Sequence, residues 1–103
     1  MKTRREILEE FVSQEPDDSF SRYAYALELE KEGRTDESVH QLREVIRRDS
    51  NYVAAYYHLG RLLAKSGVED EARDVYNRGL IAATAAGDQR SRNEIQEALE
   101  MLD

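Results

Sequence analysis

The sequence contains no cysteine, no tryptophan, one proline and only three lysines among its 103 residues. Without cysteine the chain cannot form a disulfide or offer a thiolate to a metal ion. No hydrophobic run approaches the ~20 apolar residues that a membrane-spanning helix needs. Near the N-terminus, Glu6, Glu9 and Glu10 interrupt any stretch that could act as a secretory signal. We therefore expect a cytoplasmic protein that does not bind membranes.

Positive charge is also scarce. The 15 Lys and Arg residues face 22 acidic residues, and the formal net charge is -7. Binding to nucleic-acid phosphates requires an excess of Lys and Arg, so we expect no nucleic-acid partner. The acid excess is compatible with a salt-adapted source or with the ordinary charged outer faces of helices.

The single proline, Pro16, marks the first boundary in the chain. Before it, apolar residues recur at helical spacing and predict a helix over about residues 3–14. These apolar residues are Ile7, Leu8, Phe11 and Val12. After the helix the chain reads as a turn, because a residue that precedes proline is disfavoured in a helix.

Five further helices are predicted from apolar periodicity, capping residues and glycine stops. Asp18 or Ser19 caps the second helix, Thr35 the third and Asp88 the sixth. No segment alternates with a period of two for long enough to be a strand, so the fold class is all-α. The expected ranges are about 19–32, 35–49, 50 or 51 to 67, 69–86 and 88–102.

The chain repeats itself. A single shift that carries Gly33 onto Gly67 overlays the sequence on itself without a gap, and it also matches the acidic pair that follows each glycine. We name this displacement the repeat shift. Its length is typical of a solenoid of stacked helix pairs. The identical pairs are Tyr23 and Tyr57, Leu29 and Leu63, Lys31 and Lys65, Gly33 and Gly67, Asp36 and Asp70, and Glu37 and Glu71.

The second copy resembles a tetratricopeptide repeat (TPR). It has the bulky residue, the Leu-Gly pair, the alanine after an acidic turn, the aromatic residue and the late small residue of that family. The first copy is weaker, because Arg22 stands at the bulky position. The residues that carry the resemblance are Tyr56, Leu59, Gly60, Ala72, Tyr76 and Gly79.

This resemblance implies a single TPR-like domain, a right-handed α-α superhelix of about six antiparallel helices. We expect small Gly60 and Ala72 to let the paired helices approach, while Tyr56 and Tyr76 fill the seam between them. The implied layout is a partial leading repeat at 4–18, repeats at 19–52 and 53–86, and a capping helix at 87–103.

Residues that could carry chemistry are few. His40 and His58 are the only histidines, and neither has a second histidine at the i+4 spacing of a metal pair. The sequence shows no glycine-rich phosphate loop and no nucleophile beside a base. We expect no enzyme activity, no cofactor and no metal.

The resemblance also implies a concave face, formed mainly by the first helix of each pair. Arg61, beside Tyr57, could hold a carboxylate or carbonyl group of a bound peptide. The Lys and Asn residues with which some family members hold a peptide carboxylate are replaced here. The expected groove residues are Phe20, Tyr23, Leu27 and Glu30 in the first repeat, and Ala54, Tyr57, Arg61 and Ala64 in the second. In the capping helix Asp88, Ser91, Ile95 and Ala98 would continue the stripe.

The apolar part of the first stripe, which contains Phe20, Tyr23 and Leu27, allows three interpretations. The residues could be core covered by the N-terminal helix, an exposed patch that binds a peptide or a partner helix, or a surface for self-association. The sequence therefore predicts a protein-interaction module that binds a protein or peptide. The alternative is a structural unit, either a homodimer or a fragment of a longer scaffold.

Overall fold

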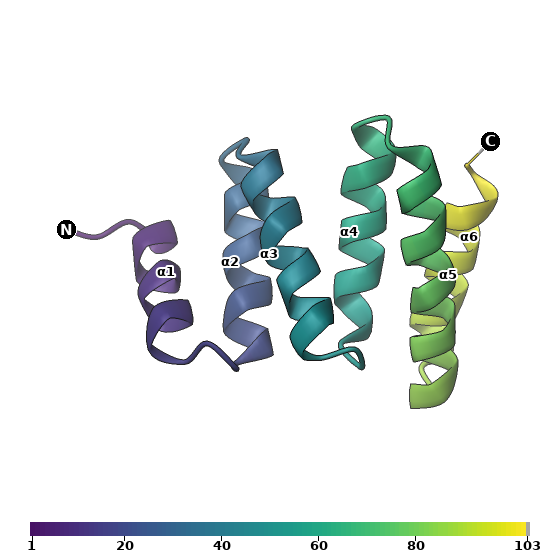
Figure 1. Cartoon of the computed structure of the whole chain (residues 1–103), viewed down its shortest axis with the longest axis horizontal. Helices are drawn as coiled ribbons and strands as arrows, with labels where there is room; N and C mark the ends of the chain where they lie inside the picture. The colour runs from purple at the N-terminus through teal and green to yellow at the C-terminus, as the bar shows by residue number, and fades with distance from the viewer. Residues whose placement is uncertain (103) are drawn as a thin grey trace. The chain divides into compact units, whose positions relative to one another are not determined.

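The computed structural model describes residues 1–102, which form six α-helices and no strand (Figure 1). The all-α prediction is confirmed, and each helix lies close to its expected range; residue 103, the end of the expected capping segment, lies outside the described residues. The helices are α1 (Arg4–Gln14), α2 (Ser19–Lys31), α3 (Thr35–Arg48), α4 (Val53–Lys65), α5 (Glu69–Ala86) and α6 (Gln89–Glu100). None of these described helices has the length and apolar character that crossing a membrane requires.

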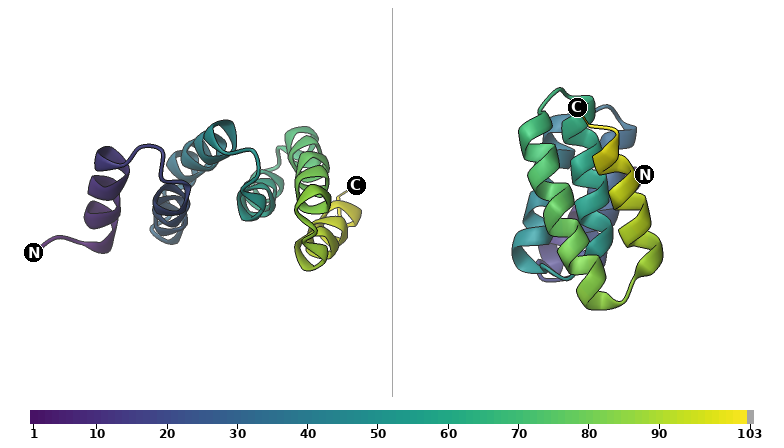
Figure 2. Two further views of the ribbon diagram at one scale, coloured as in Figure 1. Left: turned by 90° about the horizontal axis from the view of Figure 1, so that it is seen from below. Right: turned by 90° about the vertical axis from the view of Figure 1, so that its right-hand side faces the viewer.

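Close contacts divide the chain into two compact units, the first from Met1 to Asp49 and the second from Ser50 onward. In the first unit α1 packs against α2, and α2 lies beside α3. In the second unit α4 and α5 lie side by side, and α6 packs against both (Figures 1 and 2). The C-terminal end of α5 extends past the end of α4, and the chain turns there into α6.

Two glycines end the first helices of the predicted repeats. Gly33 has φ of 79° and Gly67 has φ of 83°, a left-handed conformation that glycine adopts without a steric penalty. In the second turn, the backbone N–H of Val68 donates to the carbonyl of Leu63 at 2.9 Å, as in the usual glycine-terminated helix end. The predicted stops at both glycines are confirmed.

Two predictions about helix starts, the cap of α3 and the first residue of α4, were wrong. Thr35 is the first residue of α3 rather than its cap, and Arg34 holds the cap position. The Arg34 guanidinium has no acceptor atom; it donates to the Glu37 carboxylate, and no side chain caps this end of the helix. Helix α4 begins at Val53, later than expected, and the Tyr56 hydroxyl donates to the Ser50 carbonyl at 2.7 Å within the turn before it. The prediction that Asp88 caps α6 is confirmed.

The first unit buries an apolar cluster between α1 and α2. Leu8, Tyr25 and Leu29 form its centre, and Val12 and Ala24 pack against it. The Tyr25 hydroxyl reaches the edge of the cluster and donates to a Glu9 carboxylate oxygen at 2.9 Å. This cluster attaches α1 to the rest of the unit.

Between α2 and α3, small residues occupy the contact. Ala26 and Ser38 are both fully buried, and the Ser38 hydroxyl donates to the carbonyl of Ala26 at 2.7 Å. Ser38 takes the place of Ala72 under the repeat shift. The hydrogen bond therefore satisfies the one polar group that this replacement brings into the core.

Arg22, which replaces the bulky residue of the first repeat, is buried with only 7% of its surface exposed. Its guanidinium donates to Gln41 on α3 at 2.8 Å and to the carbonyl of Pro16 at 3.1 Å. Arg48, at the end of α3, donates to the same carbonyl at 3.3 Å and to Asp17 at 2.9 Å. The turn between α1 and α2 is therefore bonded to α3.

In the second unit, α4 and α5 pack through two glycine–tyrosine contacts. A Cβ atom on Gly60 would lie 2.3 Å from the Tyr76 ring, and one on Gly79 would lie 2.7 Å from the Cβ of Tyr56. Each tyrosine thus occupies the space that a side chain on the opposite helix would need. Ala72 is fully buried, and the expected packing of this helical hairpin is confirmed.

Candidate partner-binding surfaces

Three of the predicted groove residues in the first unit line one open hollow, which we name the first-unit hollow. Its volume is about 560 Å³, and Phe20, Tyr23 and Leu27 of α2 form its apolar part. Phe20 is 68% exposed, while Tyr23 and Leu27 are partly buried. These residues therefore lie on the surface of the unit and are not part of its buried core. The remaining lining residues are Arg4, Ala24, Glu28 and Lys31.

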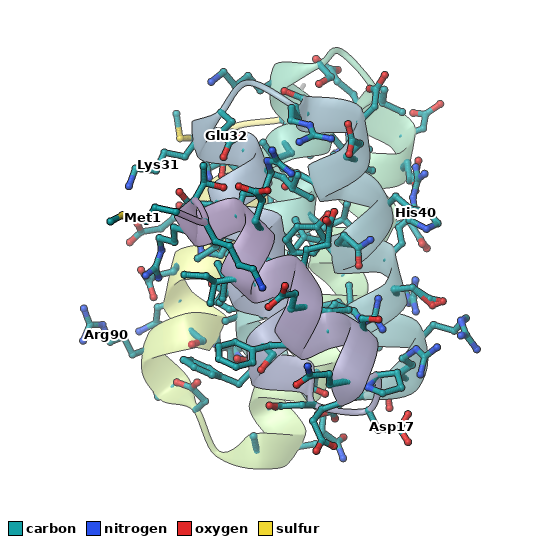
Figure 3. The ribbon with its side chains drawn as sticks, turned by 90° about the vertical axis from the view of Figure 1, so that its left-hand side faces the viewer. Met1, Asp17, Lys31, Glu32, His40 and Arg90 are labelled. Atoms are coloured by element: carbon teal, nitrogen blue, oxygen red, sulfur yellow. The ribbon has the colours of Figure 1, made fainter. Side chains whose placement is uncertain are left out.

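Charged side chains border the first-unit hollow at one end. The Arg4 guanidinium lies 3.2 Å from the Glu28 carboxylate, and Lys31 is exposed at the C-terminal end of α2. Figure 3 shows Lys31 at this end of the first unit and Asp17 at the opposite end. The hollow thus combines an apolar floor with a mixed-charge border. Glu30, the fourth predicted residue of the stripe, is partly buried and lies outside this lining.

In the second unit, Tyr57 lines a smaller hollow of about 290 Å³ between α4 and α6, which we name the second-unit hollow. The ring of Tyr57 meets that of His58 edge to face, with centroids 5.6 Å apart. Arg61 lies next to this pair, with its Nη2 atom 3.5 Å from His58 Nδ1. The other lining residues are Val53, Ala54, Ser91 and Glu94.

Two residues of α4, Tyr57 and Arg61, affect the ionisation of Tyr76, which is buried in the hairpin of α4 and α5. Burial raises the pKa of the Tyr76 phenol, and the neighbouring Tyr57 raises it further, while the positive charge of Arg61 acts in the opposite direction. Tyr57 and Arg61 are therefore close enough to the Tyr76 hydroxyl to affect its ionisation. Ala64, the last predicted residue on this stripe, is partly buried.

The capping helix continues the predicted stripe only in part. Asp88 accepts a hydrogen bond from the Ser91 backbone at 3.0 Å, and Ser91 lines the second-unit hollow. Ile95 was expected on the same surface but is fully buried. Its Cδ1 atom would lie 3.1 Å from a Cβ on Gly79, so the missing side chain of Gly79 leaves room for Ile95 in the core. Ala98 is partly buried.

Three residues that line the second-unit hollow were not predicted from the sequence, namely Val53, His58 and Glu94. His58 has no partner at metal-ligand spacing, so no functional role was expected, whereas it lines the hollow and contacts both Tyr57 and Arg61. Its spacing of three residues from Arg61 was the available signal, since such pairs share one helix face. Glu94 comes from α6, so its position depends on a helix that lies far away in the sequence.

The two hollows present apolar and aromatic side chains at the surface of their units. Among the described residues, no three His, Cys, Asp or Glu side chains gather as a metal site would require. His40 is exposed on the outer side of α3 (Figure 3). The apolar and aromatic side chains of the two hollows are instead suited to contacts with another polypeptide.

Comparison with known proteins agrees with the repeat seen in the sequence. The family model described as tetratricopeptide repeat matches residues 2–83. No curated protein matches the chain significantly. A crystal structure of a tetratricopeptide repeat domain protein from Salinibacter ruber is 35% identical, with a TM-score of 0.76, over 80% of this chain and 91% of that one.

Two further solved structures are similar to the chain. A protein from Bordetella parapertussis is 29% identical, with a TM-score of 0.80, over 97% of this chain and 87% of that one. The TPR2B domain of yeast Sti1, solved in complex with pHsp70, is 15% identical, with a TM-score of 0.73, over 91% of this chain and 81% of that one. At that identity the likeness shows the fold alone.

These matches agree with the six helices, the internal repeat and the glycine stops. The TPR fold is generally a protein–protein interaction module and not an enzyme. The family model covers most of the chain, and the Salinibacter ruber domain is more than a third identical. The chain therefore belongs to the tetratricopeptide repeat family.

Proposed function

We propose that this chain binds a peptide or a helix of a partner protein on the surfaces of its first helices. On α2 the binding residues would be Phe20, Tyr23, Leu27 and Glu30, and on α4 they would be Tyr57 and Arg61. The proposal treats the two surfaces separately, because each lies within its own unit. It includes no cofactor and no catalytic step.

The observation that carries this proposal is the exposure of Phe20 at the first-unit hollow. A phenylalanine that keeps 68% of its surface in contact with solvent contributes little to the fold and leaves apolar area available to a partner. Tyr23 and Leu27 extend the same apolar surface along α2. A side chain of a bound peptide would fill the hollow and remove this area from water.

The second unit supports a more polar contact. Arg61 can donate up to five hydrogen bonds from one planar group, and Tyr57 places an aromatic ring near it. A carbonyl or carboxylate of a bound peptide would be a suitable acceptor for Arg61. Tyrosine and arginine are also enriched among residues that dominate protein interfaces.

We further propose the repeat layout that the sequence predicts, with a partial leading repeat at 4–18, repeats at 19–52 and 53–86 and a capping helix at 87–103. The helix boundaries are compatible with it, since α2 with α3 and α4 with α5 form matching pairs. Each pair would then present its first helix to a partner.

Selection from a random peptide library on the immobilised protein tests the binding proposal. The affinities of selected peptides would be measured by fluorescence anisotropy for wild type, for Phe20→Ser and for the double variant Tyr57→Ala/Arg61→Ala. We expect one or both changes to weaken binding by about tenfold or more, which corresponds to about 1.4 kcal/mol. The matched control is Ile81→Ser, because Ile81 is exposed on α5 and outside both hollows.

Equal affinity of all four proteins for every selected peptide would exclude both surfaces. Chemical-shift changes in ¹⁵N-labelled protein would then show where the peptides bind instead. Thermal melts of each variant must accompany these measurements, since loss of folded protein would imitate loss of affinity.

A second candidate function is self-association as a structural unit. One observation favours it: Ile7 and Phe11 on α1 leave apolar surface exposed that belongs to neither hollow. Sedimentation velocity at several protein concentrations distinguishes a self-associating chain from a monomeric binding module.

A further inference from the structure

Helix α1 has two apolar faces. Leu8 and Val12 face α2 and pack in the cluster around Leu29. Ile7 and Phe11 are 41% and 50% exposed and lie outside that cluster. With Arg4 and Gln14 they follow one another at spacings of three and four residues, so the four residues form one stripe along the helix. We name this stripe, which consists of Arg4, Ile7, Phe11 and Gln14, the α1 outer face.

The internal repeat shows what covers the same face elsewhere in the chain. The repeat shift carries Ile7 onto Gln41 of α3, which accepts a hydrogen bond from Arg22 on the preceding helix. Applied twice, it carries Phe11 onto Gly79 of α5, which packs against Tyr56 on its preceding helix. In both complete pairs, α2 with α3 and α4 with α5, the first helix thus covers the face of the second helix that corresponds to the α1 outer face.

We propose that the α1 outer face binds the same face of a second copy of the chain, with the two helices antiparallel. This inference rests on the second candidate function and specifies its surface. A two-fold axis at the level of Glu9 places Ile7 of each copy opposite Phe11 of the other, and Arg4 opposite Gln14. Glu9 itself is directed toward α2, where it accepts from Tyr25, so its carboxylate does not enter the contact.

The charge distribution of α1 fits an antiparallel copy. The basic residues of this segment, Lys2, Arg4 and Arg5, precede Ile7, and the acidic residues Glu10 and Glu15 follow it. An antiparallel arrangement brings the basic end of each helix near the acidic end of the other, and this is a complementary arrangement. It also opposes the two helix dipoles.

Within one copy, some of these charges already have partners. Lys2 pairs with Glu10 along α1, and Arg4 and Arg5 pair with Glu28 and Glu32 of α2. All three pairs are solvent-accessible to some degree, so they contribute little to stability and can adjust to a neighbour. The charges therefore orient the second copy, while Ile7 and Phe11 supply the apolar contact.

Helix α6 of a second copy fits the α1 outer face less well than α1 does. From α4 to α6, the repeat shift replaces Tyr56, Gly60 and Leu63 by charged residues. Tyr56 and Gly60 meet residues of α5, and Leu63 is buried. Placing charged groups from these positions on Ile7 and Phe11 would remove them from water without compensation. A head-to-tail chain of copies is therefore disfavoured. The replacing residues are Arg90, Glu94 and Glu97.

The contact is small, because each copy contributes two large apolar residues to it. Stable interfaces commonly bury about 800 Å² on each partner, which one short helix face does not supply. We therefore expect a dimer that dissociates on dilution. Its equilibrium would be measured by sedimentation velocity over a range of protein concentrations.

The first test compares wild type with Ile7→Ser/Phe11→Ser. We expect this double variant to dimerise at least about tenfold more weakly, because each copy loses its apolar contact residues. Ile81→Ser is the matched control, since it removes an exposed isoleucine from α5 and should leave dimerisation unchanged. Circular dichroism shows whether the double variant remains folded.

The second test does not remove the apolar residues. The chain has no cysteine, so a short bismaleimide crosslinker would react only with thiols introduced as Arg4→Cys or Gln14→Cys. In the antiparallel dimer, position 4 of one copy faces position 14 of the other. Identical positions of the two copies lie about 15 Å apart along the helix axis, at about 1.5 Å per residue. A mixture of the two variants should therefore cross-link much more than either alone.

Dimers that weaken in the double serine variant, together with preferential cross-linking in the mixture, would support the inference. Two results would contradict the proposed contact: either cysteine variant alone cross-links as well as the mixture, or the double serine variant dimerises like wild type. In both cases the chain would self-associate through another surface. A wild-type chain that stays monomeric at every concentration would exclude both. The result for Ile7→Ser/Phe11→Ser does not bear on peptide binding, because Ile7 and Phe11 line neither hollow. Arg4→Cys is used only for cross-linking, since Arg4 also lines the first-unit hollow.

Discussion

The ring of Tyr76 on α5 occupies the space that a side chain on Gly60 of α4 would need. A Cβ atom at Gly60 would lie 2.3 Å from Cε1 of this ring, far inside normal contact distance. Gly60 is therefore required by its neighbour, although glycine lowers the intrinsic stability of a helix. The pair fixes how closely α4 and α5 approach.

We expect Gly60→Ala to destabilise the fold by about 1–3 kcal/mol, the usual range for overpacking a core. The higher helix propensity of alanine offsets up to about 1 kcal/mol of this loss. Urea denaturation measures the free energy of unfolding. In a double-mutant cycle with Tyr76→Leu, the smaller side chain should reduce the cost of the alanine. Strictly additive effects would contradict the contact.

A second prediction concerns Tyr25 and Glu9. Burial, together with the hydrogen bond to Glu9, raises the pKa of the Tyr25 phenol. Glu9→Gln should lower that pKa toward the ordinary value, which NMR titration of the tyrosine ring would measure. Tyr76 serves as the internal control, because its pKa is raised without any contribution from Glu9.

The raised pKa of Tyr25 also makes the stability of the fold depend on pH. Because the pKa of Tyr25 is higher in the folded state, the folded protein holds this proton more tightly than the unfolded chain. The contribution of Tyr25 to the free energy of unfolding is complete below the unfolded pKa of about 10. It is lost as the pH rises through the pKa of the folded state. As the pH rises through this range, Glu9→Gln should therefore lose less stability through the ionisation of Tyr25 than wild type does, which alkaline denaturation would measure. An unchanged profile would contradict the assignment.

A third prediction concerns the cap of α6. Hydrogen bonds from the side chain and the backbone of Ser91 lower the pKa of the Asp88 carboxyl. A lowered folded pKa stabilises the protein above the unfolded value, and this stabilisation is lost as the pH falls through the folded value. The difference in Tm between wild type and Asp88→Ala should therefore narrow below about pH 4.

Asp88→Asn is the matched control for this cap. Asparagine caps helices about as well as aspartate but does not titrate, so its Tm difference from Asp88→Ala should not depend on this ionisation. A difference between wild type and Asp88→Ala that persists unchanged in acid would argue against a charged cap.

A fourth prediction separates binding from folding at Phe20. Because this side chain is mostly exposed, Phe20→Ser should change stability by no more than about 0.5 kcal/mol. Leu29→Ala provides the contrast, since Leu29 is fully buried and its truncation should cost about 2–5 kcal/mol. Thermal or urea denaturation of both variants measures the difference. A large loss of stability in Phe20→Ser would mean that Phe20 is a folding residue.

The helices and their glycine stops could be predicted from the sequence because both depend on local signals. Gly33 and Gly67 need a left-handed backbone, and the repeat shift placed them at equivalent positions. Ile95 was misplaced because its burial depends on the missing side chain of Gly79, which lies on another helix. The position of His58 in a hollow could not be predicted for a similar reason, since residues of α6 complete that hollow.

The small cluster that joins α1 to α2 has a consequence for hydrogen exchange. Leu8 is the only residue of α1 that is buried among those described, so α1 can open without disrupting the packing of α2 on α3. Its amides should exchange through such local opening, faster than those around Leu42. The turn at Pro16 would stay in place during this opening, because Arg22 of α2 and Arg48 of α3 both donate to the Pro16 carbonyl.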